Sequence, residues 1–124
     1  MLFRSYATGL LPVALLALIV MAWFWPVTLC GRRPVGEDIG GLYLPLMSYY
    51  GSALAQGRIP LWNEQWNLGV PGLAESQMGV FYPPHLLLYH LLSAVDAHTL
   101  SLIVHFLLAA WFAYWCARGF ELSR

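Results

Sequence analysis

The chain has 124 residues, of which 60% are hydrophobic and only 10% are charged, and its formal net charge is zero. Soluble domains carry about 25% charged residues, so this composition excludes an ordinary soluble domain. A neutral chain also lacks the basic surface through which proteins bind nucleic acid. We therefore expect a small membrane protein with membrane lipid, and no nucleic acid, as a partner.

The first predicted element is a membrane span over residues 10–30. This stretch holds 21 residues without a charge, which as a helix would cross a hydrocarbon core of about 30 Å. Pro12 falls in its first turn, where a missing N–H costs little. Trp23 and Trp25 mark its far end, as interfacial aromatic residues do. The run exceeds a signal-peptide core and lacks a small-residue cleavage site, which favours an uncleaved anchor.

Residues 31–95 form a long outer segment that is dense in Pro, Gly, Trp and Tyr. A disordered linker would be poor in aromatic residues, so we expect this segment to fold against the outer membrane surface. Two short interfacial helices are predicted in it, over residues 45–56 and 84–95. Pro45 suits the first turn of the earlier helix, and Gly57 suits its C-terminal stop.

The helix predicted over residues 45–56 has one apolar face, because its hydrophobic side chains recur at helical spacing. That face comprises Leu46, Met47, Tyr50, Ala53 and Leu54. The stretch between the two short helices is punctuated by Pro and Gly and is expected to be mostly irregular. Irregular backbone beside lipid needs polar partners, so this segment is expected to pack on further transmembrane helices.

The second span is predicted over residues 97–117, and Ser101 and His105 are the polar interruptions of its apolar core. Asp96 precedes it as the expected N-cap, and Arg118 follows its aromatic belt. The arginines that flank the two spans place both termini in the cytoplasm and the middle segment outside.

The predicted fold class is thus all-α integral membrane: two transmembrane helices joined by a long outer segment with two short interfacial helices. Residues 1–124 form one membrane region. Two spans make a thin bundle, so we expect the chain to be the beginning of a larger multi-span protein whose further helices are its partners. The sequence has no phosphate loop, nucleophile motif or metal-ligand cluster.

Several motifs occur in a fixed order along the outer segment. They are Asp38, Tyr43-Leu44-Pro45, Gly57-Arg58-Ile59-Pro60-Leu61-Trp62-Asn63, Gly69-Val70-Pro71, and Gln77 through Pro84. In this order they resemble the amino-terminal part of bacterial YfhO-type membrane proteins, which carry many more spans. Those proteins are similar to GT-C-like glycosyltransferases. The resemblance implies a protein of the bacterial cytoplasmic membrane that acts on a polyprenyl-phosphate-linked sugar at the outer face.

The pair Glu37 and Asp38 is the candidate catalytic site, because proteins of this class bear an acidic residue in the first outer loop. A carboxylate there, foremost that of Asp38, would act as a general base on an acceptor hydroxyl. Alternatively it would hold a divalent cation against a phosphate. The structural alternative is a solvated acidic pair, or an N-cap, next to Arg32 and Arg33.

The candidate substrate-binding residues are Arg58, Trp62, Asn63, Gln77 and Tyr82. The guanidinium group of Arg58 matches a lipid phosphate, whereas the aromatic rings and amides combine the surfaces that contact sugars. The alternatives are headgroup contact for the arginine and interfacial anchoring for the aromatic residues. No resident metal site is predicted. The competing function is a non-enzymatic scaffold or assembly element, or an inactive truncated product.

Overall fold

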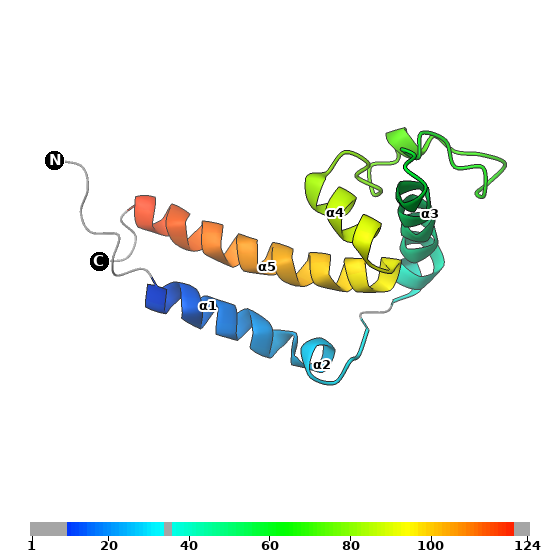
Figure 1. Ribbon diagram of the computed structural model, residues 1–124. Coiled ribbons are helices and arrows are strands. Elements are labelled where there is room, and N and C mark those ends of the chain that lie inside the picture. The colour runs from blue at the N-terminus through cyan, green and yellow to red at the C-terminus, as the bar shows by residue number, and fades with distance from the viewer. Residues whose placement is uncertain (1–9, 34–35, 121–124) are drawn as a thin grey trace. The chain divides into compact units, whose positions relative to one another are not determined.

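A computed structural model describes residues 10–33 and 36–120 of the chain (Figure 1). Every regular element within these ranges is a helix or a helical turn, which confirms the all-helical fold class. The one strand-like feature found in the described ranges is a single antiparallel bridge between Asn63 and Val70.

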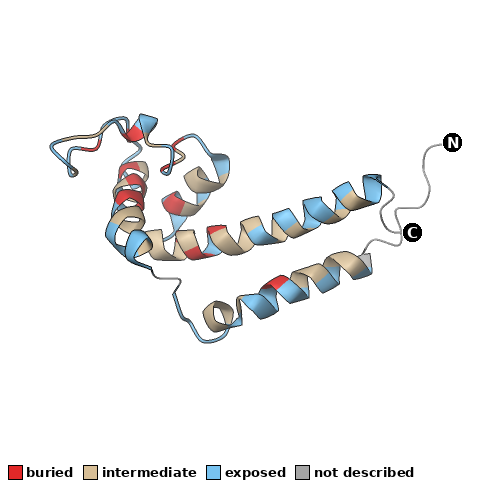
Figure 2. Cartoon of the chain, turned by 180° about the vertical axis from the view of Figure 1, so that it is seen from behind, coloured by how far each residue is buried: buried red, intermediate tan, exposed pale blue. Residues whose placement is uncertain are grey.

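The chain divides into two compact units. The helix-pair unit comprises Met1–Arg32 and Leu102–Arg124, and the central unit comprises Arg33–Ser101. Figure 2 shows that most buried residues belong to the central unit, whereas the helices of the helix-pair unit are largely exposed or partly exposed.

The first apolar stretch does not form one long helix. α1 spans Leu10–Trp23, and a separate short helix, α2, spans Trp25–Thr28. Pro26 explains the break. It lacks the N–H that would bond to the carbonyl group of Ala22, and its ring would clash with that carbonyl.

The break changes what can cross a membrane. With 14 residues, α1 rises about 21 Å, which is less than a hydrocarbon core of about 30 Å. The predicted span over residues 10–30 is therefore corrected to α1 followed by α2, and two membrane-spanning helices are not supported. α5 spans Ala94–Gly119 and has 26 residues. It is the one helix of the described ranges that is long and apolar enough to cross a membrane, in agreement with the span predicted over residues 97–117.

The beginning of α5 corrects the expected cap. The hydroxyl of Ser93 donates to the carboxylate of Asp96 at 2.7 Å, and the backbone N–H of Asp96 donates to the Ser93 hydroxyl oxygen at 3.2 Å. This reciprocal arrangement is a variant of the capping box, in which the carboxylate accepts from the Ser93 hydroxyl in place of the Ser93 backbone N–H. Ser93 is therefore the N-cap, and Asp96 occupies the third helical position, so the prediction of Asp96 as N-cap is wrong.

Two helices form the frame of the central unit. α3 spans Leu44–Ala55, α4 spans Pro83–Leu91, and the two pack against each other (Figure 1). The helix predicted over residues 45–56 is confirmed within one residue at each end. The helix predicted over residues 84–95 is wrong at its C-terminal end, because Leu92 is extended, with φ −124° and ψ 161°, and the capping box of α5 follows it.

Helical backbone begins about two turns before α3. Glu37 and Asp38 form its first residues, and a π-helical turn, η2, covers Ile39–Tyr43. Pro45 accounts for the wider turn, because it cannot donate to the carbonyl of Gly41 and its ring pushes that carbonyl away. The helical stretch 37–55 is therefore longer than the sequence pattern predicted.

The C-terminal end of α3 confirms the predicted glycine stop. Gly57 has a left-handed φ of +69°, which residues with a Cβ atom rarely adopt. The N–H of Arg58 donates to the carbonyl of Ala53, and the N–H of Gly57 donates to the carbonyl of Leu54, both at 2.9 Å. These two bonds form a Schellman motif, which satisfies the last carbonyl groups of the helix.

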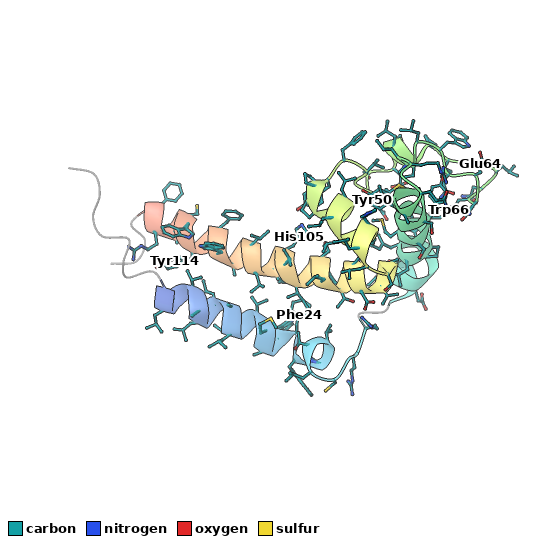
Figure 3. The ribbon with its side chains drawn as sticks, in the orientation of Figure 1. Phe24, Tyr50, Glu64, Trp66, His105 and Tyr114 are labelled. Carbon is teal, nitrogen blue, oxygen red and sulfur yellow. The ribbon has the colours of Figure 1, made fainter. Side chains whose placement is uncertain are left out.

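The core of the central unit lies between α3, α4 and the segment before α4. The buried residues of this core are Leu46, Met47, Tyr50, Met78, Val80, Tyr89 and Ala97. The apolar face predicted for α3 is confirmed, since its members are buried or packed against the core. Tyr50 reaches into this core, where its hydroxyl donates to the carbonyl of Val80 at 2.9 Å (Figure 3).

Between α3 and α4 the chain is mostly irregular, as its Pro and Gly content predicted. The exception is a single 3-10 turn, η3, over Gly72–Ala74. Gly72 is buried, and a Cβ atom on it would lie 2.4 Å from the carbonyl oxygen of Pro60. The two segments can therefore approach this closely only because Gly72 has no side chain.

A hairpin-like loop over residues 63–70 projects from this irregular stretch. Its tip is a tight turn in which Asn67 and Leu68 both have positive φ, at 48° and 64°. The N–H of Gly69 closes the turn by donating to the carbonyl of Trp66 at 2.7 Å. Positive φ at both central residues is the pattern of a type I′ turn, for which Asn-Gly is the preferred pair. Leu68 thus occupies a position that favours glycine.

Candidate functional site

The acidic pair Glu37 and Asp38 is exposed and opens the helical stretch 37–55. Free N–H groups and the helix dipole at this end favour a carboxylate. Both candidate catalytic residues are therefore presented on one rigid element. No group of three or more His, Cys, Asp or Glu side chains in the described ranges is arranged to hold a metal ion.

A polar pocket of about 240 Å³ lies in the central unit. It is lined by Gly41, Pro45, Tyr49, Asn63, Gln65 and Trp66. The helical stretch 37–55 supplies one wall, and the loop 63–70 supplies the other. Figure 3 shows Trp66 beside α3, with Glu64 farther out on the same loop. The pocket therefore forms where two segments that are distant in the sequence meet.

Asn63 is the most enclosed polar residue of this pocket, with only 2% of its surface exposed. Its backbone N–H and C=O both pair with Val70, at 2.8 and 2.9 Å. Its side-chain Oδ1 accepts a hydrogen bond from the N–H of Gln65 at 2.9 Å. These three bonds fix the amide in place, so the structure positions this candidate substrate-binding residue in the pocket.

Trp62, the second aromatic candidate, does not line the pocket. Its indole ring packs on Gly69, where an added Cβ atom would lie 2.6 Å from the indole nitrogen. Its backbone carbonyl accepts a hydrogen bond from the hydroxyl of Tyr49 at 2.5 Å. Trp62 therefore orients a pocket residue, and Trp66 supplies the indole of the pocket instead.

Arg58 lies beyond the C-terminal end of α3. Its guanidinium group donates to the side-chain oxygen of Gln56, at 2.8 and 3.1 Å. The helical stretch 37–55, which rises roughly 28 Å, begins at the acidic pair and ends before Arg58. The structure therefore does not bring Arg58 together with Asp38 in one site.

Gln77 and Tyr82 precede α4, and neither belongs to the lining of the polar pocket. Gln77 is exposed, and its backbone N–H donates to the carboxylate of Glu75 at 3.2 Å. The ring of Tyr82 meets the ring of His85 edge-on, with 5.0 Å between the ring centroids. Of the five predicted substrate-binding residues, the structure brings Asn63 to the pocket and places the other four elsewhere.

An aromatic network that the sequence pattern did not reveal lies inside the central unit. The hydroxyl oxygens of Tyr43 and Tyr89 are 3.3 Å apart, and the rings of Tyr43 and His98 have centroids 4.7 Å apart. Burial raises the pKa of the Tyr50 and Tyr89 hydroxyls above the ordinary value of 10.0, and the hydrogen bond with Tyr43 adds to the shift at Tyr89. These tyrosines are therefore neutral, internal groups that hold the helices together.

An exposed ion pair joins Arg33 to Asp96, which precedes the apolar stretch of α5. The hydrogen bond from Ser93, and then that from Arg33, lower the pKa of the Asp96 carboxyl from its ordinary value of 3.8. The sequence-based alternative placed Arg33 beside Glu37 and Asp38. In the structure Arg33 instead forms its ion pair with Asp96.

The helix-pair unit contains a groove of a different kind, with a volume of about 320 Å³. It is lined by Val13, Leu16, Ala17, Val104, Leu107, Leu108 and Trp111. Specific ligand sites orient their ligands with a few convergent polar groups. The aliphatic lining of this groove offers almost none, so the polar pocket of the central unit is the better candidate for a polar substrate.

Comparisons of the chain with protein-family models, with curated proteins and with solved structures give no match. The resemblance to YfhO-type proteins stays a prediction from the order of the motifs.

Proposed function

We propose that this chain is the amino-terminal part of a multi-span, glycosyltransferase-like membrane protein that acts on a polyprenyl-phosphate-linked sugar at the outer face of the bacterial cytoplasmic membrane. One observation carries the proposal. Asp38 lies on the same continuous helical stretch as Gly41, Pro45 and Tyr49, which line the polar pocket. An exposed carboxylate and one wall of the pocket are thus held by one helical stretch, and the loop 63–70 completes the pocket with amide and indole side chains.

In the proposed reaction an acceptor hydroxyl oxygen attacks the anomeric carbon of the sugar. The bond between that carbon and the phosphate oxygen breaks, and the lipid phosphate leaves with the electron pair. Asp38 takes the proton of the hydroxyl group, as a general base does. In the alternative role Asp38 holds a divalent cation that neutralises the leaving phosphate. Loss of transfer on chelation, with rescue by added cation, would select this second role.

The test compares sugar transfer by membranes that carry the complete protein with Asp38 or with Asp38→Asn. Removal of a general base lowers rates by about 10²–10⁴-fold, so we expect a loss of about 100-fold or more at unchanged protein level. The matched control is Glu75→Gln, because Glu75 is also acidic, and glutamine keeps the side-chain oxygen that accepts from Gln77. Full transfer by the Asp38→Asn protein would remove Asp38 from the chemistry.

The proposal includes a topology in which α5 crosses the membrane, with the segment before it outside and the C-terminus cytoplasmic. It is motivated by Arg118 and Arg124 after the apolar stretch of α5, since flanking arginines favour the cytoplasmic side. In a background without Cys30 and Cys116, a cysteine at Glu75 should react with an impermeant thiol reagent on intact cells. A cysteine at Ser123 should react only after permeabilisation. Labelling of both positions from the same side would refute this topology.

A second candidate function is a non-enzymatic assembly element whose helices pack on those of a partner. The apolar groove of the helix-pair unit favours it, since helix association in lipid depends on close packing of such surfaces. The coding sequence beyond Arg124 separates the two functions. A continuation with many further spans supports the transferase, whereas a stop codon with stable expression supports the assembly element.

A further inference from the structure

We infer that the polar pocket of the central unit binds the ring of a single uncharged hexose, with Asn63, Gln65 and Trp66 as its contact residues. The inference rests on the proposed function for its substrate class, and it goes further by assigning the sugar to a site. It also replaces most of the substrate-binding residues that the sequence suggested.

The lining of the pocket favours an uncharged ligand. None of its six residues is Arg, Lys, Asp or Glu. Recognition of a phosphate relies on cationic or backbone N–H donors, and a hard cation relies on carboxylate oxygens. The lining instead combines amides, from Asn63 and Gln65, with the apolar surfaces of Pro45 and Trp66. A pyranose ring presents the complementary pair, hydroxyl groups at its rim and C–H groups on its faces.

The volume of the pocket limits the size of the ligand. At about 240 Å³ it equals the liquid volume of about eight water molecules. Pockets for drug-sized ligands begin at about 300 Å³. One sugar ring therefore suits the pocket better than an oligosaccharide does.

Asn63 supplies an amide group to the wall of the pocket. Its Oδ1 is already occupied by the N–H of Gln65, and its backbone groups are occupied by Val70. The amide nitrogen of the same side chain is a hydrogen-bond donor. Because Asn63 lines the pocket, this group can donate to a sugar hydroxyl there without any change in the loop.

Two aromatic residues complete the site. Trp66 is partly buried against the core of the central unit, so its ring is a fixed platform for a sugar face. Tyr49 donates its hydroxyl proton to the carbonyl of Trp62, which leaves the hydroxyl oxygen as an acceptor for a sugar hydroxyl. The amide of Asn63, the hydroxyl oxygen of Tyr49 and the ring of Trp66 therefore surround one small pocket.

The test is saturation-transfer NMR on the full chain in lipid nanodiscs, which contain no sugar headgroup to compete. The probes are methyl glucoside, methyl galactoside and N-acetylglucosamine, with inorganic phosphate as the charged comparison. Asn63→Asp keeps an oxygen for Gln65 and replaces the donor. Gln65→Ala alters an exposed side chain and leaves the core intact. The control is Asn67→Asp, which makes the same chemical change in the same loop outside the pocket lining.

We expect at least one hexoside to bind, and the Asn63→Asp and Gln65→Ala variants to bind it about tenfold more weakly, the cost of one lost hydrogen bond. The Asn67→Asp protein should bind like the original.

A polyprenyl-phosphate-linked hexose that displaces the probe, when polyprenyl phosphate alone does not, identifies a lipid-linked sugar as the ligand. Displacement by free hexose alone identifies a soluble sugar.

The inference is overturned if the folded chain binds no hexoside, if it binds phosphate instead, or if both pocket variants bind as well as the control. Thermal unfolding of each variant shows whether it is folded, and Gln65→Ala decides the matter if Asn63→Asp is not. The outcomes separate this inference from the proposed function. Hexoside binding with full transfer by the Asp38→Asn protein keeps the pocket and overturns the catalytic role. Sugar transfer without hexoside binding does the reverse.

Discussion

The central unit and the helix-pair unit differ in how far their apolar side chains are buried. In the central unit Met47, Tyr50 and Met78 are fully buried by neighbours from the same unit. In the helix-pair unit large apolar side chains such as Leu18, Ile19 and Trp23 are mostly exposed. Exposure of apolar surface to water costs roughly 25 cal/mol per Å², whereas exposure to lipid does not.

This contrast shows where the stability of each unit originates. The central unit has its own core, so its loop and pocket are held by contacts within residues 33–101. The described residues of the helix-pair unit form no such core, so this unit needs lipid or further helices to cover it. Matched substitutions can test the contrast, since a residue that the fold constrains should respond more strongly than a similar residue that it leaves free.

The largest effect is expected from two methionines that differ in burial. Met47→Ala removes a side chain that is 0% exposed and leaves a cavity in the central core, whereas Met21→Ala alters an α1 side chain that is 40% exposed. We expect Met47→Ala to lower the free energy of unfolding by about 2–5 kcal/mol. Met21→Ala should change it by less than about 0.5 kcal/mol. Denaturation followed by near-ultraviolet circular dichroism measures both, and equal losses would contradict the contrast.

A smaller effect is expected from two glycines of the central unit. Gly72→Ala places a Cβ atom 2.4 Å from the carbonyl oxygen of Pro60, whereas Gly41→Ala meets nothing within 4 Å. Forcing atoms into a packed site costs about 1–3 kcal/mol, so the first variant should unfold at lower denaturant concentration. The second should be neutral or stabilised by up to about 1 kcal/mol. A neutral Gly72→Ala protein would show that the two loop segments do not approach this closely.

The next prediction concerns the tip of the loop 63–70 and has the opposite sign. Leu68 is fully exposed at a positive φ, so Leu68→Gly removes backbone strain and almost no packing. We expect a gain of about 0.5–1 kcal/mol in the free energy of unfolding. Leu73→Gly, at an exposed leucine without positive φ, should instead be destabilising by a similar amount. Loss of stability in the Leu68→Gly protein would rule out the left-handed turn.

The smallest effect is expected at the exposed carboxyl of Asp96. Its pKa in the folded chain lies below the ordinary value of 3.8, so its bonds to Ser93 and Arg33 stabilise the fold above that ordinary pKa. This contribution is lost as the pH falls through the lower, folded pKa. Carboxyl NMR titration should show the pKa of Asp96 rising in Ser93→Ala and, by less, in Arg33→Gln. An unchanged pKa in both variants would contradict the assigned cause.

The sequence pattern was most reliable where local and tertiary preferences agree. The spacing of Leu46, Met47 and Tyr50 predicted both the extent of α3 and its buried face, because helical period and burial act on the same residues. Gly57 predicted the end of that helix, since a left-handed cap favours glycine. The location of α5 followed from its length and apolar composition alone.

The pattern failed where two local signals competed. Hydropathy joined residues 10–30 into one span, but Pro26 interrupts the backbone hydrogen bonds there. Ser93 and Asp96 are both favoured as N-caps, and Ser93 starts α5 because its hydroxyl oxygen accepts from the backbone N–H three residues later. Propensity alone ranks such signals too closely to choose between them.

Residue composition and spacing were enough to predict the helical fold class, the membrane-length helix and the apolar face of α3, because each of these properties belongs to one element. The meeting of polar residues in a pocket required the folded chain. Trp62 and Trp66 are alike in the sequence, yet the turn at Asn67 and Leu68 brings Trp66 to the pocket and packs Trp62 on Gly69. The physical reason is that a site assembled from two separate segments depends on the backbone geometry between them, which residue type and spacing do not encode.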